Sequence, residues 1–229
     1  MLILALDSST AVVTVAVARA EDSGREVLAE VSVPSRGASE TLLLSAHDAL
    51  SLAGTDLGEV QRVLVGVGPG TFTGIRIALA AARALAFATG AALSKNSTLS
   101  ALAAPACASA AEPEVLAVLD AKRRQVFAQR FAKGRATGEI LCIEPEEFPP
   151  EERLPECTLL VGDGAVRYRE SLSSLGRIPP DVSPLHRVTA AGHVFSADLT
   201  PVPAHEVVPL YVREPDAEVR SELNPWSRQ

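Results

Sequence analysis

Apolar and polar positions in the N-terminal part of the chain predict three strands, a helix, a fourth strand and a second helix, in that order. Apolar runs rich in β-branched residues at 1–6, 11–18, 27–33 and 63–67 are typical of strands. The apolar period becomes helical at 39–53 and again at 74–89, and a glycine follows each segment. The second helix, which Thr71 or Thr73 is expected to cap, is mostly alanine and apolar nearly all round. That composition predicts neighbours on most of its sides.

The C-terminal part begins in the same way after a polar boundary at 94–98. It predicts a helix at 98–108, strands at 115–119, 125–131, 140–143 and 159–161, a solvated loop at 144–156, helices at 168–175 and 189–198, and an extended segment at 209–213. In each part the first strand ends in an aspartate before a hairpin, Asp7 in L-A-L-D and Asp120 in A-V-L-D. We therefore predict an α/β protein with two related halves, 1–97 and 98–213, and a charged tail at 214–229.

Composition and charge argue against several classes of protein. A net charge of −7 is unfavourable for binding nucleic acid unaided, because such binding depends on neutralising phosphates; the densest basic point is Lys122-Arg123-Arg124. The three cysteines are far apart and form no C-x-x-C pair, which predicts reduced thiols rather than disulfides or a zinc site. The N-terminus lacks the basic region of a signal peptide, and two arginines interrupt the most apolar helix. We expect a cytoplasmic protein without a membrane span.

Two turns could carry chemistry. Asp7, Ser9 and Thr10 follow the first strand, where a carboxylate can hold a metal-bound water and hydroxyls can face phosphate. The same residues are also suited to a tight turn, and local spacing alone favours that role. Asp120 would be the matching second aspartate across a cleft, and a turn role is sufficient for it too.

The glycine-rich turn at 68–74 resembles an anion-binding turn at a helix N-terminus, through Gly68, Gly70 and Thr71. It matches neither a Walker loop, which needs G-K-[ST], nor G-x-G-x-x-G, because Gly74 comes one residue late. A structural turn that lets two helices or two chains meet explains the glycines equally well. The sequence leaves both interpretations open.

Other signals of catalysis are missing from the sequence. The four histidines are far apart, so no helical two-histidine metal site is predicted, and no G-x-S-x-G occurs. The chain therefore has the features of a scaffold more than those of a catalyst.

Five motifs together resemble the TsaB (also called YeaZ) family of bacterial tRNA threonylcarbamoyladenosine biosynthesis proteins. They are I-L-A-L-D-S-S-T at the start, V-G-V-G-P-G-T-F-T-G-I-R in the middle, V-L-D-A-K-R-R-Q-V-F at 118–127, V-G-D-G-A at 161–165 and P-L-Y-V-R at 209–213. The resemblance implies the actin/sugar-kinase/Hsp70-like ATPase fold. It also implies a role in forming the N6-threonylcarbamoyl group on adenosine 37 of tRNAs that read ANN codons. The family often has His-Ser-Glu at the start of its first helix, where this chain has Ala38-Ser39-Glu40, which argues further against a metal role.

The resemblance further implies a non-catalytic subunit that pairs with itself or with the transferase TsaD, with the ATPase TsaE joining the complex and tRNA met only through it. The two N-terminal helices would form the partner surface, for which we predict Leu43, Ala46, Leu50, Ile75, Arg76, Leu79, Ala82 and Arg83. No cofactor is required, while ATP or ADP could occupy a vestigial site at Asp7, Ser9, Thr10, Gly68, Gly70, Thr71 and Asp120. The alternative is an autonomous ATPase or small-molecule kinase that uses Asp7 and Asp120 with Mg-ATP.

Overall fold

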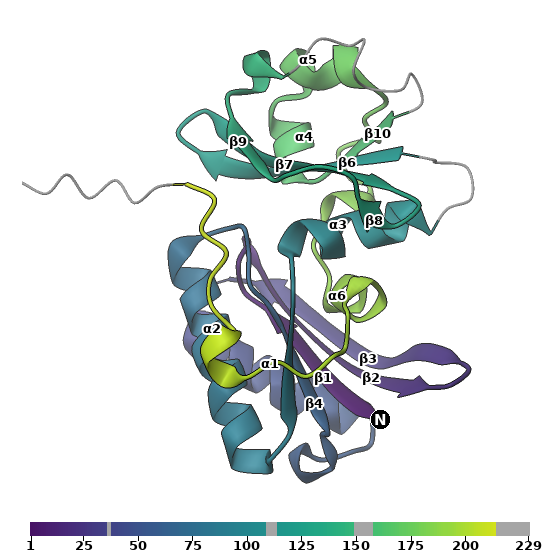
Figure 1. Cartoon of the computed structure of the whole chain (residues 1–229), viewed down its shortest axis with the longest axis vertical. Helices are drawn as coiled ribbons and strands as arrows, with labels where there is room; N and C mark the ends of the chain where they lie inside the picture. Colours follow the sequence, from purple (N-terminus) through teal and green to yellow (C-terminus); the bar gives the residue numbers. More distant parts are fainter. Residues whose placement is uncertain (36–37, 109–113, 149–157, 214–229) are drawn as a thin grey trace, which may run out of the picture.

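Two five-stranded sheets, one in each half of the chain, organise the computed structural model, which describes residues 1–35, 38–108, 114–148 and 158–213 (Figure 1). The first sheet has the order β3-β2-β1-β4-β5, in which β1 runs antiparallel to β2 and parallel to β4. Its strands are β1 (Leu2–Asp7), β2 (Val12–Glu21), β3 (Gly24–Pro34), β4 (Arg62–Gly66) and β5 (Ala92–Asn96).

The second sheet repeats the first in its pairing. β6 runs antiparallel to β7 and parallel to β10, as β1 does with β2 and β4, and β9 pairs with β7 as β3 pairs with β2. The strands are β6 (Glu114–Lys122), β7 (Gln125–Ala132), β8 (Arg135–Ala136), β9 (Leu141–Ile143) and β10 (Thr158–Val161). The two related α/β halves predicted from the sequence are confirmed.

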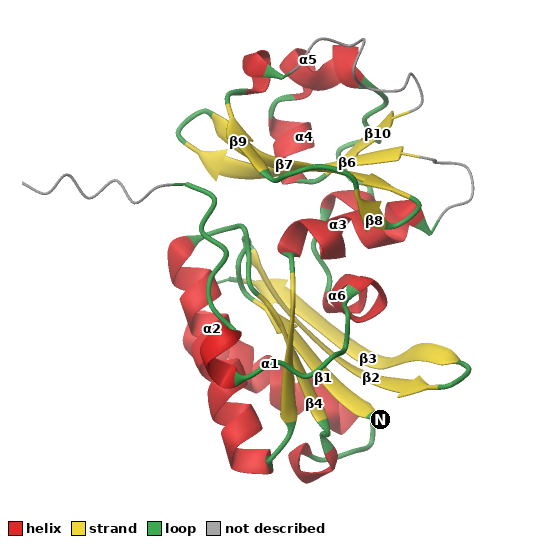
Figure 2. Ribbon diagram, viewed as in Figure 1, coloured by secondary structure: helices red, strands yellow, loops and turns green. Residues whose placement is uncertain are grey.

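Helices cover both faces of each sheet (Figure 2). In the first half, α1 (Ala38–Leu52) and α2 (Phe72–Thr89) cover one face and α6 (Ala190–Ser196) the other. Side chains alternate along a strand, so Leu4 and Leu6 of β1 pack toward α1 and α2, whereas Ile3 and Ala5 pack toward α6. This alternation explains why the strand is a continuous apolar run.

The second half is built in the same way. α3 (Thr98–Cys107) covers one face of its sheet, while α4 (Asp163–Arg167) and α5 (Arg169–Leu172) cover the other. Short 3-10 turns lie at Leu57–Glu59, Pro145–Glu147, Ser173–Leu175, Pro184–His186 and Ala204–Glu206. α3 also packs against α6, so these two helices join the halves.

The chain returns to the first half after α5. α6 packs on the first sheet, Val202 bridges to Leu93 of β5, and Leu210 N–H donates to the carbonyl of Val67. We refer to residues 199–213 as the C-terminal segment. The expected second half, 98–213, thus contributes α6 and the C-terminal segment to the packing of the first.

Most predicted elements are present, with three differences. β5 lies in the region predicted to be a polar boundary, β8 was not predicted, and in place of one helix at 168–175 the chain forms α4, α5 and a 3-10 turn at Ser173–Leu175. The segment 209–213 is extended, as predicted. The predicted tail at 214–229 and most of the loop at 144–156 lie outside the described residues.

By length and composition alone, α2 could cross a membrane. Six of its residues are buried in the fold, and its two arginines are bonded to the C-terminal segment: Arg76 to the Tyr211 hydroxyl and Arg83 to the Val207 carbonyl. These contacts are those of a core helix in an α/β fold.

Candidate functional site

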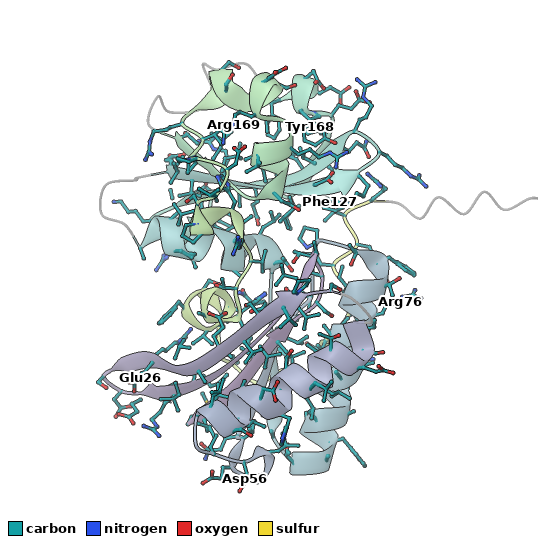
Figure 3. The ribbon with its side chains drawn as sticks, turned by 180° about the vertical axis from the view of Figure 1, so that it is seen from behind. Glu26, Asp56, Arg76, Phe127, Tyr168 and Arg169 are labelled. Atoms are coloured by element: carbon teal, nitrogen blue, oxygen red, sulfur yellow. The ribbon has the colours of Figure 1, made fainter. Side chains whose placement is uncertain are left out.

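Three of the five sequence motifs, those at 65–76, 118–127 and 209–213, meet in a cavity of about 690 Å³ between the two halves. Residues 69–72, 75 and 76 of the glycine turn and α2 line one side, and residues 120–122 and Phe127 of the β6–β7 hairpin line the other. Residues 210–213 of the C-terminal segment complete the wall. Figure 3 labels Arg76 on the first side and Phe127 on the second.

Asp7, the first predicted site residue, does not line this cavity. Its side chain is 1% exposed and both carboxylate oxygens are engaged. Oδ1 accepts the Ser9 N–H, while Oδ2 accepts Thr98 Oγ1–H at 3.0 Å and lies 2.7 Å from His193 Nε2. Burial would raise the pKa of Asp7, but the hydrogen bonds from His193 and Ser9 outweigh it and hold that pKa below its ordinary value. Asp7 therefore fastens the end of β1 to α3 and α6.

The partners of His193 indicate its tautomer. Its Nδ1 lies 3.2 Å from the amide nitrogen of Asn96, which is a donor, and that nitrogen also donates to Ser196 Oγ at 2.7 Å. Nδ1 is then the acceptor, so the proton sits on Nε2 and is donated to Asp7. His193 is fully buried, so this network is a structural clamp with no access for substrate.

Close packing against the aspartate turn explains the glycines of 68–74. A Cβ on Gly70 would lie 2.3 Å from the Ser9 carbonyl oxygen, and one on Gly74 would lie 1.9 Å from that of Ser8. Ser8 Oγ also donates to the Gly74 carbonyl, and Thr71 N–H donates to the Ser9 carbonyl. Thr71 occupies the predicted cap position without a side-chain hydrogen bond. The structural interpretation therefore accounts for this turn without a bound anion.

Replacing Gly74 with alanine is expected to lower the free energy of unfolding by about 1–3 kcal/mol, because the new methyl group would overlap the Ser8 backbone. Urea denaturation measures the change. Gly138→Ala is the matched control, since a Cβ at Gly138 meets nothing within 4 Å. Equal stability of the two variants would contradict this account of the turn.

Asp120 lines the cavity, but its carboxylate is also engaged. Oδ2 lies 2.7 Å from Lys122 Nζ and 3.3 Å from Arg167 Nη1, and the side chain is 4% exposed. Asp163 accepts the Asp120 N–H at 3.0 Å, and burial is the main cause that raises the pKa of Asp163. The carboxylate that was predicted to face magnesium thus forms ion pairs with Lys122 and Arg167.

These contacts do not fit a magnesium–nucleotide centre built on the two aspartates. Asp7 is enclosed and Asp120 is paired with cations, whereas Mg²⁺ needs carboxylates open to it and its waters. Within the described ranges, no group of three or more histidines, cysteines and acidic residues is placed to hold a metal. In this arrangement neither carboxylate is open to a metal, so the structure gives no support to the magnesium role predicted for Asp7 and Asp120, on which the kinase alternative depends. Of the other residues predicted for a nucleotide site, Gly70 and Thr71 line the cavity, whereas Ser9, Thr10 and Gly68 do not.

An aromatic stack lines the cavity at the start of α2. The Phe72 and Tyr211 rings stack with centroids 5.6 Å apart, and the Arg76 guanidinium lies 3.7 Å from the Phe72 centroid. Arg76 Nε also donates to the Tyr211 hydroxyl at 3.0 Å. No local sequence pattern indicates this cluster, because Tyr211 is 135 residues from Arg76.

Known proteins resemble the chain over most of its length. A family model described as TsaD, tRNA N6-adenosine threonylcarbamoyltransferase, matches residues 31–147. An uncharacterized protein of Mycobacterium tuberculosis is 32% identical over 217 residues, covering 94% of this chain and 93% of that protein. TsaB of Escherichia coli, described as a tRNA threonylcarbamoyladenosine biosynthesis protein, is 32% identical over 127 residues, 56% of this chain and 53% of that protein. The structure of YeaZ from Pseudomonas aeruginosa has a TM-score of 0.74 at 24% identity, covering 92% of this chain and 99% of that chain.

The chain belongs to the TsaB (YeaZ) family. The actin/sugar-kinase/Hsp70-like ATPase fold predicted from the sequence is confirmed.

In this TsaB-family chain, the side chains predicted to face a partner divide into two groups. Five of them are buried in the chain's own core and present no surface: Ala46, Leu50, Ile75, Leu79 and Ala82. Leu43, Arg76 and Arg83 are exposed. The apolar side chains that α1 and α2 do expose include Leu43, Leu44, Leu52 and Phe87, at 52%, 63%, 70% and 92%. Five of the eight predicted residues belong to the core stripe of the helices, so a partner surface here must use residues outside it, among them Leu43, Arg76 and Arg83.

Proposed function

We propose that this TsaB-family chain acts in tRNA threonylcarbamoyladenosine biosynthesis as a non-catalytic partner subunit. In this proposal it supports a TsaD-type transferase that modifies adenosine 37 in tRNAs reading ANN codons. One observation carries the non-catalytic role: both aspartates at the strand ends are engaged within the chain, Asp7 by His193 and Asp120 by Lys122 and Arg167. A catalytic member of this fold needs such carboxylates free for metal and nucleotide.

The proposed partners are the transferase TsaD as a heterodimer, the ATPase TsaE, and a second copy of the chain as a homodimer. Exposed apolar side chains on the adjacent helices α1 and α2 support a protein partner there. The tRNA would be met within the complex, since an overall net charge of −7 is unfavourable for binding nucleic acid unaided. The proposal places this assembly in the cytoplasm.

The chain needs no cofactor of its own in this proposal. The contacts of Asp7 with His193 and of Asp120 with Arg167 argue against a Mg-ATP site within the single chain. ATP or ADP is assigned instead to a site that exists only in the assembled complex.

Reconstitution tests the proposed function. The transferase, TsaE and the threonylcarbamoyl-adenylate synthase are incubated with tRNA and substrates, with this chain present or omitted, and threonylcarbamoyladenosine is measured by mass spectrometry of nucleosides. Modification should require the chain and fall to background without it. Equal modification in both reactions would contradict the proposal.

A further inference from the structure

The turn that joins β6 to β7 carries three consecutive cations on an unusual backbone. Lys122, Arg123 and Arg124 all have positive φ angles, of 62°, 52° and 63°. Two-residue hairpin turns of this hand are usually made by Asn-Gly or Gly-Gly, because other residues are disfavoured there. All three side chains are exposed. The fold thus holds a run of positive charge at a position where glycine would be easier to accommodate.

The cavity beside this hairpin carries positive charge on an acidic protein. Lys122, Arg76 and Arg213 all line it. Asp120 is the one acidic residue among the described residues of its wall, and Lys122 and Arg167 both contact its carboxylate. The whole chain has a net charge of −7, so this face differs in sign from the average surface.

Aromatic surface is available in the same cavity. Phe72 is 55% exposed and Tyr211 is 47% exposed; the two rings stack on each other, and the Arg76 guanidinium lies over the Phe72 ring. Stacked rings next to a guanidinium form a platform on which an unpaired base can lie. Cations at the hairpin then stand where the phosphates of the same strand would pass.

We propose that this face binds an unpaired segment of RNA, with a base against the Tyr211 ring of the aromatic stack and phosphates against the Lys122–Arg124 hairpin. The inference rests on the proposed function, which brings tRNA to the complex. An unpaired strand fits better than a duplex, because only its bases are free to enter a cavity and stack. Charge complementarity favours RNA over an apolar protein segment as the occupant, since the cations extend beyond the cavity to Arg123 and Arg124.

The experiment titrates an RNA stem–loop, with 2-aminopurine in its unpaired loop, against the chain assembled with the transferase. Arg123→Gln/Arg124→Gln should weaken binding and lower the salt-dependence slope by about 0.7 for each phosphate that the variant no longer neutralises. The matched control is Lys133→Gln/Arg135→Gln, which removes the same charge from the exposed turn at the other end of β7. The control should bind RNA as the wild type does.

The aromatic platform is tested in the same titrations. Tyr211→Ala should weaken binding roughly five- to one-hundred-fold and reduce the quenching of 2-aminopurine, because a stacking surface is removed. Tyr211→Phe keeps the ring and should retain most of the quenching, which separates stacking from the hydroxyl bond to Arg76. Phe195→Ala, at another exposed ring, is the control and should change neither measurement.

Several outcomes would overturn the RNA inference. They are an unchanged affinity of the hairpin variant in an intact complex, an equal loss of affinity in the Lys133/Arg135 control, and equal binding of a blunt duplex. If the hairpin variant fails to join the transferase, while the variant chain alone binds RNA at low salt as the wild-type chain does, this face would be assigned to a protein. If the wild-type chain does not assemble at all, the proposed function fails, and titration of the chain alone at low salt still decides the inference.

Discussion

Replacing His193 with alanine is expected to lower the free energy of unfolding by about 3–5 kcal/mol. The change would leave the Asp7 carboxylate buried without the hydrogen-bond donor that lies 2.7 Å from its Oδ2, and a buried charge left without its partner is costly. Urea denaturation followed by circular dichroism measures the decrease. His205→Ala is the control, because the His205 side chain is 82% exposed, and it should change stability by less than about 0.5 kcal/mol.

His193→Gln tests the hydrogen bond more narrowly. Its amide N–H can replace Nε2–H as a donor to Asp7, so the decrease in stability should be smaller than for alanine. If glutamine and alanine cost the same, the hydrogen bond to Asp7 is not what stabilises this junction.

The contact between Asp7 and His193 also predicts how the free energy of unfolding decreases in acid. The pKa of Asp7 is lower in the folded protein than its ordinary value of 3.8, so the ionised form is favoured by folding. Its contribution is therefore complete above pH 3.8 and is lost as the pH falls below that value through the folded pKa. His193→Ala should flatten this decrease in acid. An unchanged profile between pH 5 and the acid transition would show that another carboxyl group controls it.

The spacing of apolar residues was sufficient to predict most strands and helices, because their core positions are apolar and repeat with the period of the element. It failed at β5 because Ser94 and Asn96 are polar, although Ser94 is fully buried and bonds to the Leu199 and Thr200 carbonyls. A short edge strand with bonded polar residues has the composition of a loop. Partners supplied by the C-terminal segment could not be foreseen from this stretch.

The sequence predicted which turns contain the candidate residues, but not which side chains those residues contact. Asp7, Asp120 and the glycine turn were found because motifs mark strand ends. Their chemistry depends on residues distant in sequence: His193 is 186 positions from Asp7. Nothing near either residue indicates that the carboxylate is already paired. For that reason the sequence could not separate a phosphate-facing aspartate from a structural one.

The partner surface shows a related limit. Helical periodicity identifies the apolar stripe that packs on the sheet, and this stripe contains Leu50, Leu79 and Ala82. A residue that faces a partner is instead an apolar side chain left outside the stripe. Leu44 and Phe87 are such residues; the periodicity already places Leu44 outside the stripe, whereas the exposure of Phe87 becomes evident only when the core is known.

Replacing Leu44 and Phe87 with lysine should abolish co-purification with the transferase or with a second copy of the chain. Each substitution places a charge where an apolar contact is proposed, and a central contact of this kind contributes at least about 2 kcal/mol, or about 30-fold in affinity. The fold should survive, since both side chains are more than half exposed and lysine is a good helix former. Size-exclusion chromatography and isothermal titration calorimetry measure assembly and affinity.

Two comparisons make this result specific to the surface. Val182→Lys changes a side chain that is 86% exposed in the second half, and it should bind as the wild type does. Leu79→Lys should lose binding as well, but because a charge buried in the core unfolds the chain, which circular dichroism detects. Only loss of assembly in a folded Leu44→Lys/Phe87→Lys chain supports a partner on α1 and α2. Full assembly of that folded variant would move the proposed interface to another face.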